Sequence, residues 1–237
     1  IGRHDQFGGR LDMRPDRIAI YSYAHLPQRF PHQAPLEGLP RPDAPQKYAL
    51  FAMARQRLLD AGYLAIGMDH FALPEDELAL ALARGTLHRN FMGYTVQHAP
   101  DQLGFGASAI SEAADCYMQN LKEAEIYCDM VARGGLPVER GMALSRDDVI
   151  RRWVIRRLMC AFSLDTTLFQ QTAGVSFETY FARERDELAY YEAEGMLSLE
   201  DGRLNITPLG AVFVRTICMV FDAYLKEQKR DIFSRTI

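Results

Sequence analysis

The sequence has little that suits a protein bound to nucleic acid or to a membrane. Its 27 lysines and arginines are outnumbered by 31 aspartates and glutamates, so the net charge is −4. A broad basic surface for phosphates or anionic lipids is therefore not expected. No uninterrupted apolar run approaches the roughly 18 residues of a membrane-spanning helix. With 48% hydrophobic residues, the chain is predicted to be globular, soluble and cytoplasmic, with neither nucleic acid nor membrane as a partner.

Cysteine is also scarce, and its spacing excludes the common metal-binding patterns. The four cysteines are far apart in the sequence: Cys116, Cys128, Cys160 and Cys218. No two of them form a CxxC pair, and no neighbouring histidine completes a zinc pattern. Since each has apolar neighbours, we expect four buried free thiols in a reducing compartment and no metal site.

Residues 1–137 have the pattern of a parallel α/β unit. Residues 17–24 (RIAIYSYA) and 63–68 (YLAIGM) are short apolar runs, typical of strands buried on both faces. A helix is predicted between them, from near Pro45 to Gly62, and another over residues 75–84. A strand, a helix and a strand in this order predict a parallel crossover, with a site at the C-terminal ends of the strands.

Residues 138–237 have a different pattern, and Pro137 is the predicted boundary between two domains. Ser145 with Asp148 predicts a capped helix start, and a second helix is predicted over 177–194. Alternating apolar residues around Asp201-Gly202 predict a hairpin over 197–206, before a long closing helix that starts at Thr207 and Pro208. This order predicts a mostly helical, winged-helix-like domain.

Four basic side chains follow or flank the predicted strands: His25, His70, His88 and Arg89. One interpretation is a cationic rim that binds an acidic substrate, since arginine holds carboxylates through two hydrogen bonds. The alternative is that each is a hydrogen-bonded polar residue at a loop edge. No HxxE or HxH spacing is present, so a metal site at these residues is not predicted.

A second basic cluster lies on the helix after Ser145: Arg146, Arg151, Arg152, Arg156 and Arg157. The favoured interpretation is a solvated face paired with Asp147 and Asp148. A nucleic-acid patch would need support from the hairpin. Residues 177–237 contain 8 basic and 11 acidic residues, so they are poorly charged for phosphate contacts.

Several longer segments together resemble one enzyme family. They are YAHLP (23–27), GYLAIGMDHFALPEDELA (62–79), LHRNFMGYT (87–95), LGFGASAIS (103–111), CYMQN (116–120), RGMALSRDDVIRR (140–152) and the ending FSRTI. Their order and content closely resemble the C-terminal half of the oxygen-independent coproporphyrinogen III oxidases (dehydrogenases), a family of the radical S-adenosylmethionine (SAM) superfamily. The resemblance extends from about Arg17 to Ile237.

The resemblance implies a fold and a reaction. The fold is the C-terminal part of a partial parallel β/α barrel followed by the helical domain. The reaction is the oxidative decarboxylation of two propionates of coproporphyrinogen III to vinyl groups, which gives protoporphyrinogen IX in haem biosynthesis without oxygen. The implied cofactors are SAM and a [4Fe–4S] cluster, and the implied partners are the substrate and an electron donor for the cluster.

The resemblance also assigns residues. Ala24 and Ile110 match positions that contact SAM in the family. Phe91 and Met92 match a pair associated with a second SAM site. Glutamine is common in the family where this chain has Met92, so here a thioether replaces the side-chain amide.

The CxxxCxxC loop that holds the cluster in this family is absent from the sequence. The family carries that loop in its N-terminal half, and this chain opens with Ile1 rather than methionine. We therefore expect the C-terminal part of a longer enzyme, inactive by itself. Two alternatives remain: a catalytically silent relative that binds haem or a porphyrinogen, and a winged-helix nucleic-acid binder.

Overall fold

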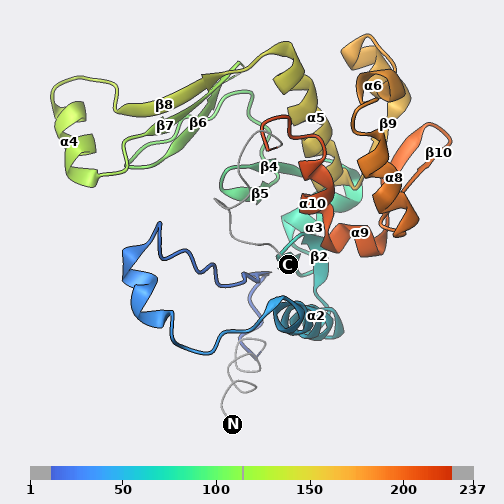
Figure 1. Cartoon of the computed structure of the whole chain (residues 1–237), viewed down its shortest axis with the longest axis horizontal. Helices are drawn as coiled ribbons and strands as arrows, with labels where there is room; N and C mark the ends of the chain where they lie inside the picture. The colour runs from blue at the N-terminus through green and yellow to red at the C-terminus, as the bar shows by residue number, and fades with distance from the viewer. Residues whose placement is uncertain (1–11, 114, 226–237) are drawn as a thin grey trace.

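The computed structural model describes residues 12–113 and 115–225. The FSRTI ending lies outside the described residues. The fold is mixed α/β, with helices and several small antiparallel sheets. Figure 1 shows helices α5 to α10 gathered on one side, a long three-stranded arm extending away from them, and the N-terminal elements opposite that arm. None of the described helices is both long enough and apolar enough to cross a bilayer.

The first sheet contains β1 (Arg17–Ala19), β2 (Leu64–Gly67) and β3 (His70–Ala72) in the order β1-β3-β2. Both pairings are antiparallel, so β1 and β2 run parallel to each other, as the predicted crossover requires, but β3 lies between them and no purely parallel sheet forms. The physical reason is a two-residue turn at Met68 and Asp69. Met68 has a φ of 46°, and this turn folds the chain back, placing β3 between β1 and β2.

The two predicted helices of this part are confirmed. Helix α2 (Ala44–Asp60) begins at a capping box formed by Asp43 and Gln46, and α3 (Glu77–Arg84) begins at Asp76 and ends at a left-handed Gly85. The predicted apolar stripe of α2 is only partly buried, because Leu50 and Met53 are 51% and 40% exposed. The proline-rich passage before α2, predicted as a loop, contains one short 3-10 helix, η1 (Pro31–Leu36).

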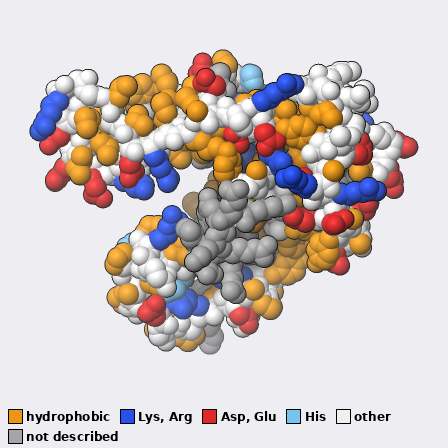
Figure 2. Space-filling view, turned by 45° about the horizontal axis from the view of Figure 1, so that its top comes forward, with side chains coloured by type: hydrophobic (Ala, Val, Ile, Leu, Met, Phe, Trp, Pro, Cys, Tyr) orange, Lys and Arg blue, Asp and Glu red, His pale blue; other side chains and the backbone are white. Residues whose placement is uncertain are grey.

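A hairpin and the arm follow α3. The hairpin pairs β4 (His88–Asn90) with β5 (Gly93–Thr95). The arm is the antiparallel sheet of β6 (Ile110–Ala113), β7 (Cys116–Asn120) and β8 (Val138–Ala143), with α4 (Ala124–Ala132) at its far end (Figure 1). The space-filling view shows apolar side chains on the surface of this arm (Figure 2). Strand β7 comes before Pro137 in the sequence and pairs with β8, which comes after it. A domain boundary at Pro137 would therefore separate two hydrogen-bonded strands.

Helix α5 (Arg146–Ala161) begins as predicted, at the capping box of Ser145 and Asp148. The next two elements, β9 (Ser163–Asp165) and α6 (Thr166–Ala173), were not predicted. The single helix predicted over 177–194 is wrong, because the chain forms α7 (Phe177–Tyr180) and α8 (Arg185–Ala193) with a turn between them. Glu184 lies at this turn, buried and paired with an arginine of α5, a long-range contact that local pattern does not reveal.

The predicted hairpin is confirmed as β10 (Leu197–Glu200) and β11 (Arg203–Ile206), and β9 adds a third strand beside β11. The long closing helix is wrong, since it is divided into α9 (Pro208–Val212) and α10 (Val214–Met219). Tight packing fixes α9 against the chain before the hairpin. A Cβ atom on Gly210 would lie 1.8 Å from the carbonyl oxygen of Met196, so only glycine fits.

The largest hydrophobic core lies within the helical part. Seventeen buried residues between Ile150 and Phe221 form one cluster. At its centre the rings of Phe169, Phe177, Phe181 and Phe221 pack at centroid distances of 5.0–6.2 Å. Two smaller clusters lie under β2, β3 and the helices α2 and α3.

The four cysteines are free thiols in the structure, but they are not all buried. Cys160 and Cys218 are buried as predicted. Cys128 on α4 is exposed and Cys116 on β7 is half-buried, because the arm has no second layer over either residue. The expectation of four buried thiols is therefore wrong for these two.

Candidate active site

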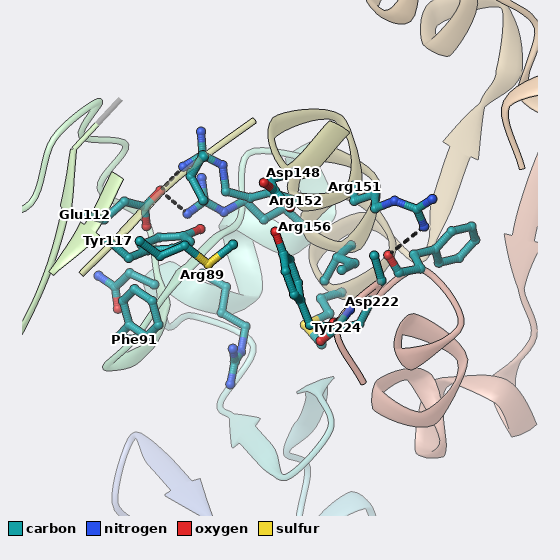
Figure 3. Close-up of a pocket in the computed structure, with 17 residues that line it drawn as sticks. Arg89, Phe91, Glu112, Tyr117, Asp148, Arg151, Arg152, Arg156, Asp222 and Tyr224 are labelled. Carbon is teal, nitrogen blue, oxygen red and sulfur yellow. Dashed lines mark hydrogen bonds and ion pairs between the residues drawn. The ribbon is translucent and has the colours of Figure 1, made fainter. Parts of the chain in front are cut away.

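A cavity of about 430 Å³ lies where the β4–β5 hairpin and the arm meet α5 (Figure 3). Its walls come from β4, β6, β7, β8, α5 and the segment that follows α10. The residues around it are Arg89, Asn90, Phe91, Glu112, Tyr117, Met142, Leu144, Asp148, Arg151, Arg152, Ile155, Arg156, Met159, Phe221, Asp222, Ala223 and Tyr224. The volume suits part of a large ligand.

One wall is an ion cluster that joins β6 to α5. The Glu112 carboxylate is buried and accepts hydrogen bonds from Arg152, at 3.2 Å, and from Arg156 (Figure 3). One buried carboxylate thus faces two guanidinium groups, and the pair of contacts joins β6 to α5. The arginines of α5 were predicted as a solvated face paired with Asp147 and Asp148. That is wrong for Arg152, whose side chain is only 17% exposed and whose carboxylate partner is Glu112.

Arg151 lies at the opposite end of the cavity and is held by several acceptors. It donates to Asp147 at 2.7 Å, to the buried Glu184 at 3.0 Å and to the carbonyl oxygen of Phe221 at 3.2 Å. Tyr180 also donates to Asp147, at 2.5 Å, and burial together with that carboxylate raises the pKa of Tyr180 to about 12. Arg151 is thus a structural cross-link within the helical part.

Arg89 enters the cavity from β4, and its guanidinium points away from Glu112 (Figure 3). The guanidinium carbon lies 5.7 Å from the centroid of the Tyr94 ring. Tyr94 is buried and donates a hydrogen bond of 3.0 Å to the carbonyl oxygen of Met159 on α5. Burial, as the main cause, raises the pKa of Tyr94, so its hydroxyl stays protonated and keeps this bond.

Aromatic rings cover the side of the cavity next to the arm. Phe91 and Tyr117 pack edge to face with centroids 5.2 Å apart, and the guanidinium of Arg152 lies over the Tyr117 ring at 5.7 Å. Phe91 is half exposed, and Tyr224 across the cavity is 45% exposed. These rings offer an apolar surface for a flat ligand, beside the arginines.

The residues that the resemblance assigns to SAM are placed as follows. Phe91 lines the cavity, whereas Met92 is 87% exposed at the turn of the hairpin and does not. Ala24 lies before η1, and its carbonyl oxygen already accepts a hydrogen bond from Gln33. Ile110 begins β6 and lies outside the cavity.

The predicted cationic rim is only partly assembled. His70 lies edge-on to Tyr94, the same ring on which Arg89 stacks, and its Nδ1 is 2.7 Å from Asp69. His88 packs against His98, with ring centroids 4.6 Å apart. His25 belongs to the passage before η1 and contacts Arg41 at 2.8 Å. Of the four predicted residues, only Arg89 lines the cavity.

Sequence reasoning missed the acidic partner of the site. Neither Glu112 nor Tyr117 was assigned a role from the sequence. No local signal could have identified them, because Glu112 reaches its arginines across 40 and 44 residues of sequence. The pairing depends on the arm folding back onto α5.

The described residues do not fit an iron–sulfur cluster. No group of three or more potential metal-ligating side chains is found among them. Burial raises the pKa of the Cys160 thiol to about 11 and also raises that of Cys218, whereas cluster ligands are thiolates.

Comparisons with known proteins identify the family. The family model described as the HemN C-terminal domain matches residues 144–213, from the end of β8 to the start of α10. The oxygen-independent coproporphyrinogen III oxidase of Thermostichus vulcanus is 42% identical over 229 residues, which are 96% of this chain and 70% of that relative. The chain belongs to the oxygen-independent coproporphyrinogen III oxidase family. The resemblance drawn from the motifs is confirmed.

Other members of the oxygen-independent coproporphyrinogen III oxidase family are similar over nearly the whole chain. The Salmonella typhimurium relative is 44% identical and the Escherichia coli relative 42% identical, each over 227 residues, 95% of this chain and 50% of the relative. The chain thus spans about half the length of these relatives. It is also similar to the structure of E. coli coproporphyrinogen III oxidase (HemN), described as a radical SAM enzyme, with a TM-score of 0.88 and 41% identity over 93% of this chain and 51% of that one.

Proposed function

We propose that this chain forms the substrate-enclosing part of an enzyme that converts coproporphyrinogen III to protoporphyrinogen IX without oxygen. The observation that carries the proposal is the cavity. It joins Arg89 and Phe91, from the family-like segment LHRNFMGYT, to α5 of the matched domain. Arginines beside apolar rings suit a substrate with carboxylate groups on a macrocycle of flat pyrrole rings.

The reaction removes carbon from two propionate side chains. Each propionate becomes a vinyl group and releases CO₂, one proton and two electrons. Binding in a cavity closed by the arm and α5 would hold the propionate in place and exclude water from the reacting carbon. We propose that this chain's contribution is that positioning.

The cofactors are proposed to be SAM and a [4Fe–4S] cluster, with an electron donor as a further partner. Because the described thiols do not fit the cluster, we propose that its ligands come from polypeptide outside this sequence. We further propose that Ala24, Ile110, Phe91 and Met92 contact SAM, and that His25, His70, His88 and Arg89 surround the substrate. A partial barrel up to residue 137, a winged-helix-like domain over 138–237 and a cytoplasmic location complete the proposal.

An anaerobic complementation assay tests the function. The chain is co-expressed with the half of the E. coli relative that contains the cluster loop, then supplied with SAM, dithionite and coproporphyrinogen III. We expect protoporphyrinogen IX from the combination and none from either part. The control is the same E. coli half with its cluster cysteines replaced by serine. Loaded cluster and bound substrate without any product would contradict the proposal.

A catalytically silent protein that binds haem or a porphyrinogen is the second candidate, and the same cavity with its arginines and aromatic rings would serve it. Titration with haem separates the two candidates. Stable haem binding by the chain, with no product in the complementation assay, supports the silent relative.

A further inference from the structure

We propose that Arg89 is the residue that binds a propionate carboxylate of the substrate, and that Tyr94 is its positioning residue. The inference rests on the proposed function and assigns one side chain to the charged group of the substrate. It selects Arg89 on the basis of charge, burial and packing. The alternatives are the other arginines of the cavity and the three histidines of the predicted cationic rim.

The first argument is the charge balance around the cavity. Arg151 has carboxylate partners in Asp147 and Glu184, and Arg152 and Arg156 share Glu112. No carboxylate of the described residues pairs with Arg89. Its Nε is one of two buried side-chain polar atoms in the described part of the chain that have no hydrogen-bond partner. The guanidinium is thus left without a protein acceptor at Nε, and a carboxylate that reached its terminal N–H groups would balance its charge.

The second argument is that Arg89 is held in place before the ligand arrives. Its guanidinium stacks on Tyr94, the Tyr94 hydroxyl is fixed to Met159 of α5, and His70 packs edge-on against the same ring at 5.3 Å. His70 is in turn held by Asp69. An arginine supported in this way loses little side-chain entropy when it binds a carboxylate.

The third argument is that the histidines are poorly suited to bind an anion. The Nε2 of His25 faces an Arg41 N–H donor at 2.8 Å, so it accepts that bond and offers no N–H of its own to an anion there. Burial lowers the pKa of His88, and the neighbouring His98 and Arg156 lower it further, so His88 is mostly neutral at pH 7. His70 lies beside the Asp69 carboxylate, whose negative charge repels an anion.

The fourth argument is the surface beside Arg89. Phe91 follows two residues later and packs against Tyr117 on the same cavity. A propionate is attached to a pyrrole ring through two methylene groups. A carboxylate on Arg89 would therefore bring a flat, apolar ring within reach of these aromatic side chains.

The test compares a charged and an uncharged ligand. Coproporphyrin III, the stable aromatic form of the substrate, and its tetramethyl ester are titrated against the full chain in the same dilute detergent, followed by porphyrin fluorescence. We expect Arg89→Gln to weaken binding of the acid about 10-fold or more and to leave binding of the ester unchanged. Arg89→Lys should retain part of the affinity. Arg133→Gln, at the exposed end of α4, removes the same charge and should change neither.

Tyr94 is tested by a double-mutant cycle. Tyr94→Leu should weaken binding of the acid in the wild-type chain. It should have little further effect in Arg89→Gln, because both changes disrupt the same pair, Arg89 stacked on Tyr94. Tyr94→Phe, which keeps the ring and loses only the bond to Met159, should have a smaller effect than Tyr94→Leu. Circular dichroism confirms that each variant is folded. If the Tyr94 variants do not fold, the comparison of Arg89→Gln with Arg89→Lys still decides the role of Arg89.

The outcomes separate this inference from the function on which it rests. If the wild-type chain binds the acid and Arg89→Gln binds it equally well, Arg89 is not the anchor and the proposed function is unaffected. If Arg89→Gln weakens the acid and the ester equally, its role is not carboxylate binding. If the wild-type chain binds neither ligand, the inference and the proposed substrate are both wrong.

Discussion

The helical part and the arm differ in how they bury apolar surface. Residues between Ile150 and Phe221 form a single core of seventeen buried side chains, from five helices and three strands. The arm contributes no member to the hydrophobic clusters of the described residues. Near its strands Phe105 and Leu136 are 86% and 85% exposed. The helical part therefore supplies its own stability, whereas the arm depends on polar contacts at its base.

The proposed site lies where these two regions meet. Glu112 from the arm pairs with Arg152 and Arg156 from the rigid helix α5, and the cavity opens beside this contact. A rigid wall fixes the position of charged groups, and a less buried wall can adjust to a ligand. The comparison suggests that α5 positions the substrate and the arm encloses it.

The largest expected effect comes from the centre of the helical core. Phe169 is fully buried and contacts the rings of Phe177 and Phe181, so Phe169→Ala should lower the free energy of unfolding by about 3–5 kcal/mol. Leu136→Ala in the arm should change it by less than about 0.5 kcal/mol. Urea denaturation followed by tyrosine and tryptophan fluorescence measures both. Equal losses would show that the two regions do not differ as described.

The contact between the regions should have the next largest effect. Glu112→Gln leaves Arg152 and Arg156 facing a neutral amide, and we expect a loss of about 2 kcal/mol. Hydrogen exchange should increase in β6 and β7 while the core of the helical part stays protected. Glu123→Gln, on the exposed start of α4, is the matched control and should leave exchange unchanged. Unchanged protection of β6 in Glu112→Gln would show that the ion cluster does not hold the arm.

Prediction from the sequence succeeded where short-range chemistry decides the structure. The start of α2 near Pro45, the capping box of Ser145 and Asp148 and the Asp201-Gly202 turn depend on residues within four positions of one another, and all were confirmed. It failed where a distant contact decides. The helix predicted over 177–194 is interrupted next to Glu184, which is buried and paired with Arg151 of α5. The predicted closing helix is divided, and its Gly210 packs against the carbonyl oxygen of Met196.

The site shows the same division. Phe91 was found because a contiguous segment resembles the family, and Arg89 because it is a basic residue next to the predicted strands; both line the cavity. Glu112 was not found, because its partners are at least 40 residues away. Strand β3 was missed for a local reason, since the two-residue turn at Met68 and Asp69 was interpreted as the end of a strand rather than as a turn into the next one.

A smaller effect is expected from the hairpin of the helical part. Gly202 has a φ of +72°, so Gly202→Ala introduces a side chain into the left-handed region and should cost about 1 kcal/mol. Gly38→Ala has no positive φ and no atom near the added Cβ, so it should be neutral or slightly stabilising. Thermal denaturation compares the two. A neutral Gly202→Ala would mean that this turn contributes little to the stability of the helical part.

The smallest effect is a pH dependence at the hairpin β4–β5, close to the contact between the regions. Burial, then His98 and Arg156, lower the pKa of His88 below its ordinary value of 6.5. The unfolded chain therefore takes up a proton on His88 at a higher pH than the folded chain. Neutral His88 contributes its full stabilisation above pH 6.5, and that contribution is lost as the pH falls through the folded-state pKa.

Replacing His88 should therefore make the free energy of unfolding less dependent on pH. Between about pH 7.5 and about pH 5, which brackets the pKa of an ordinary histidine, the free energy of unfolding should fall less in His88→Gln than in the wild-type chain. His32→Gln, on the exposed helix η1, should behave as the wild type. An identical acid response in His88→Gln would mean that folding does not lower the pKa of His88.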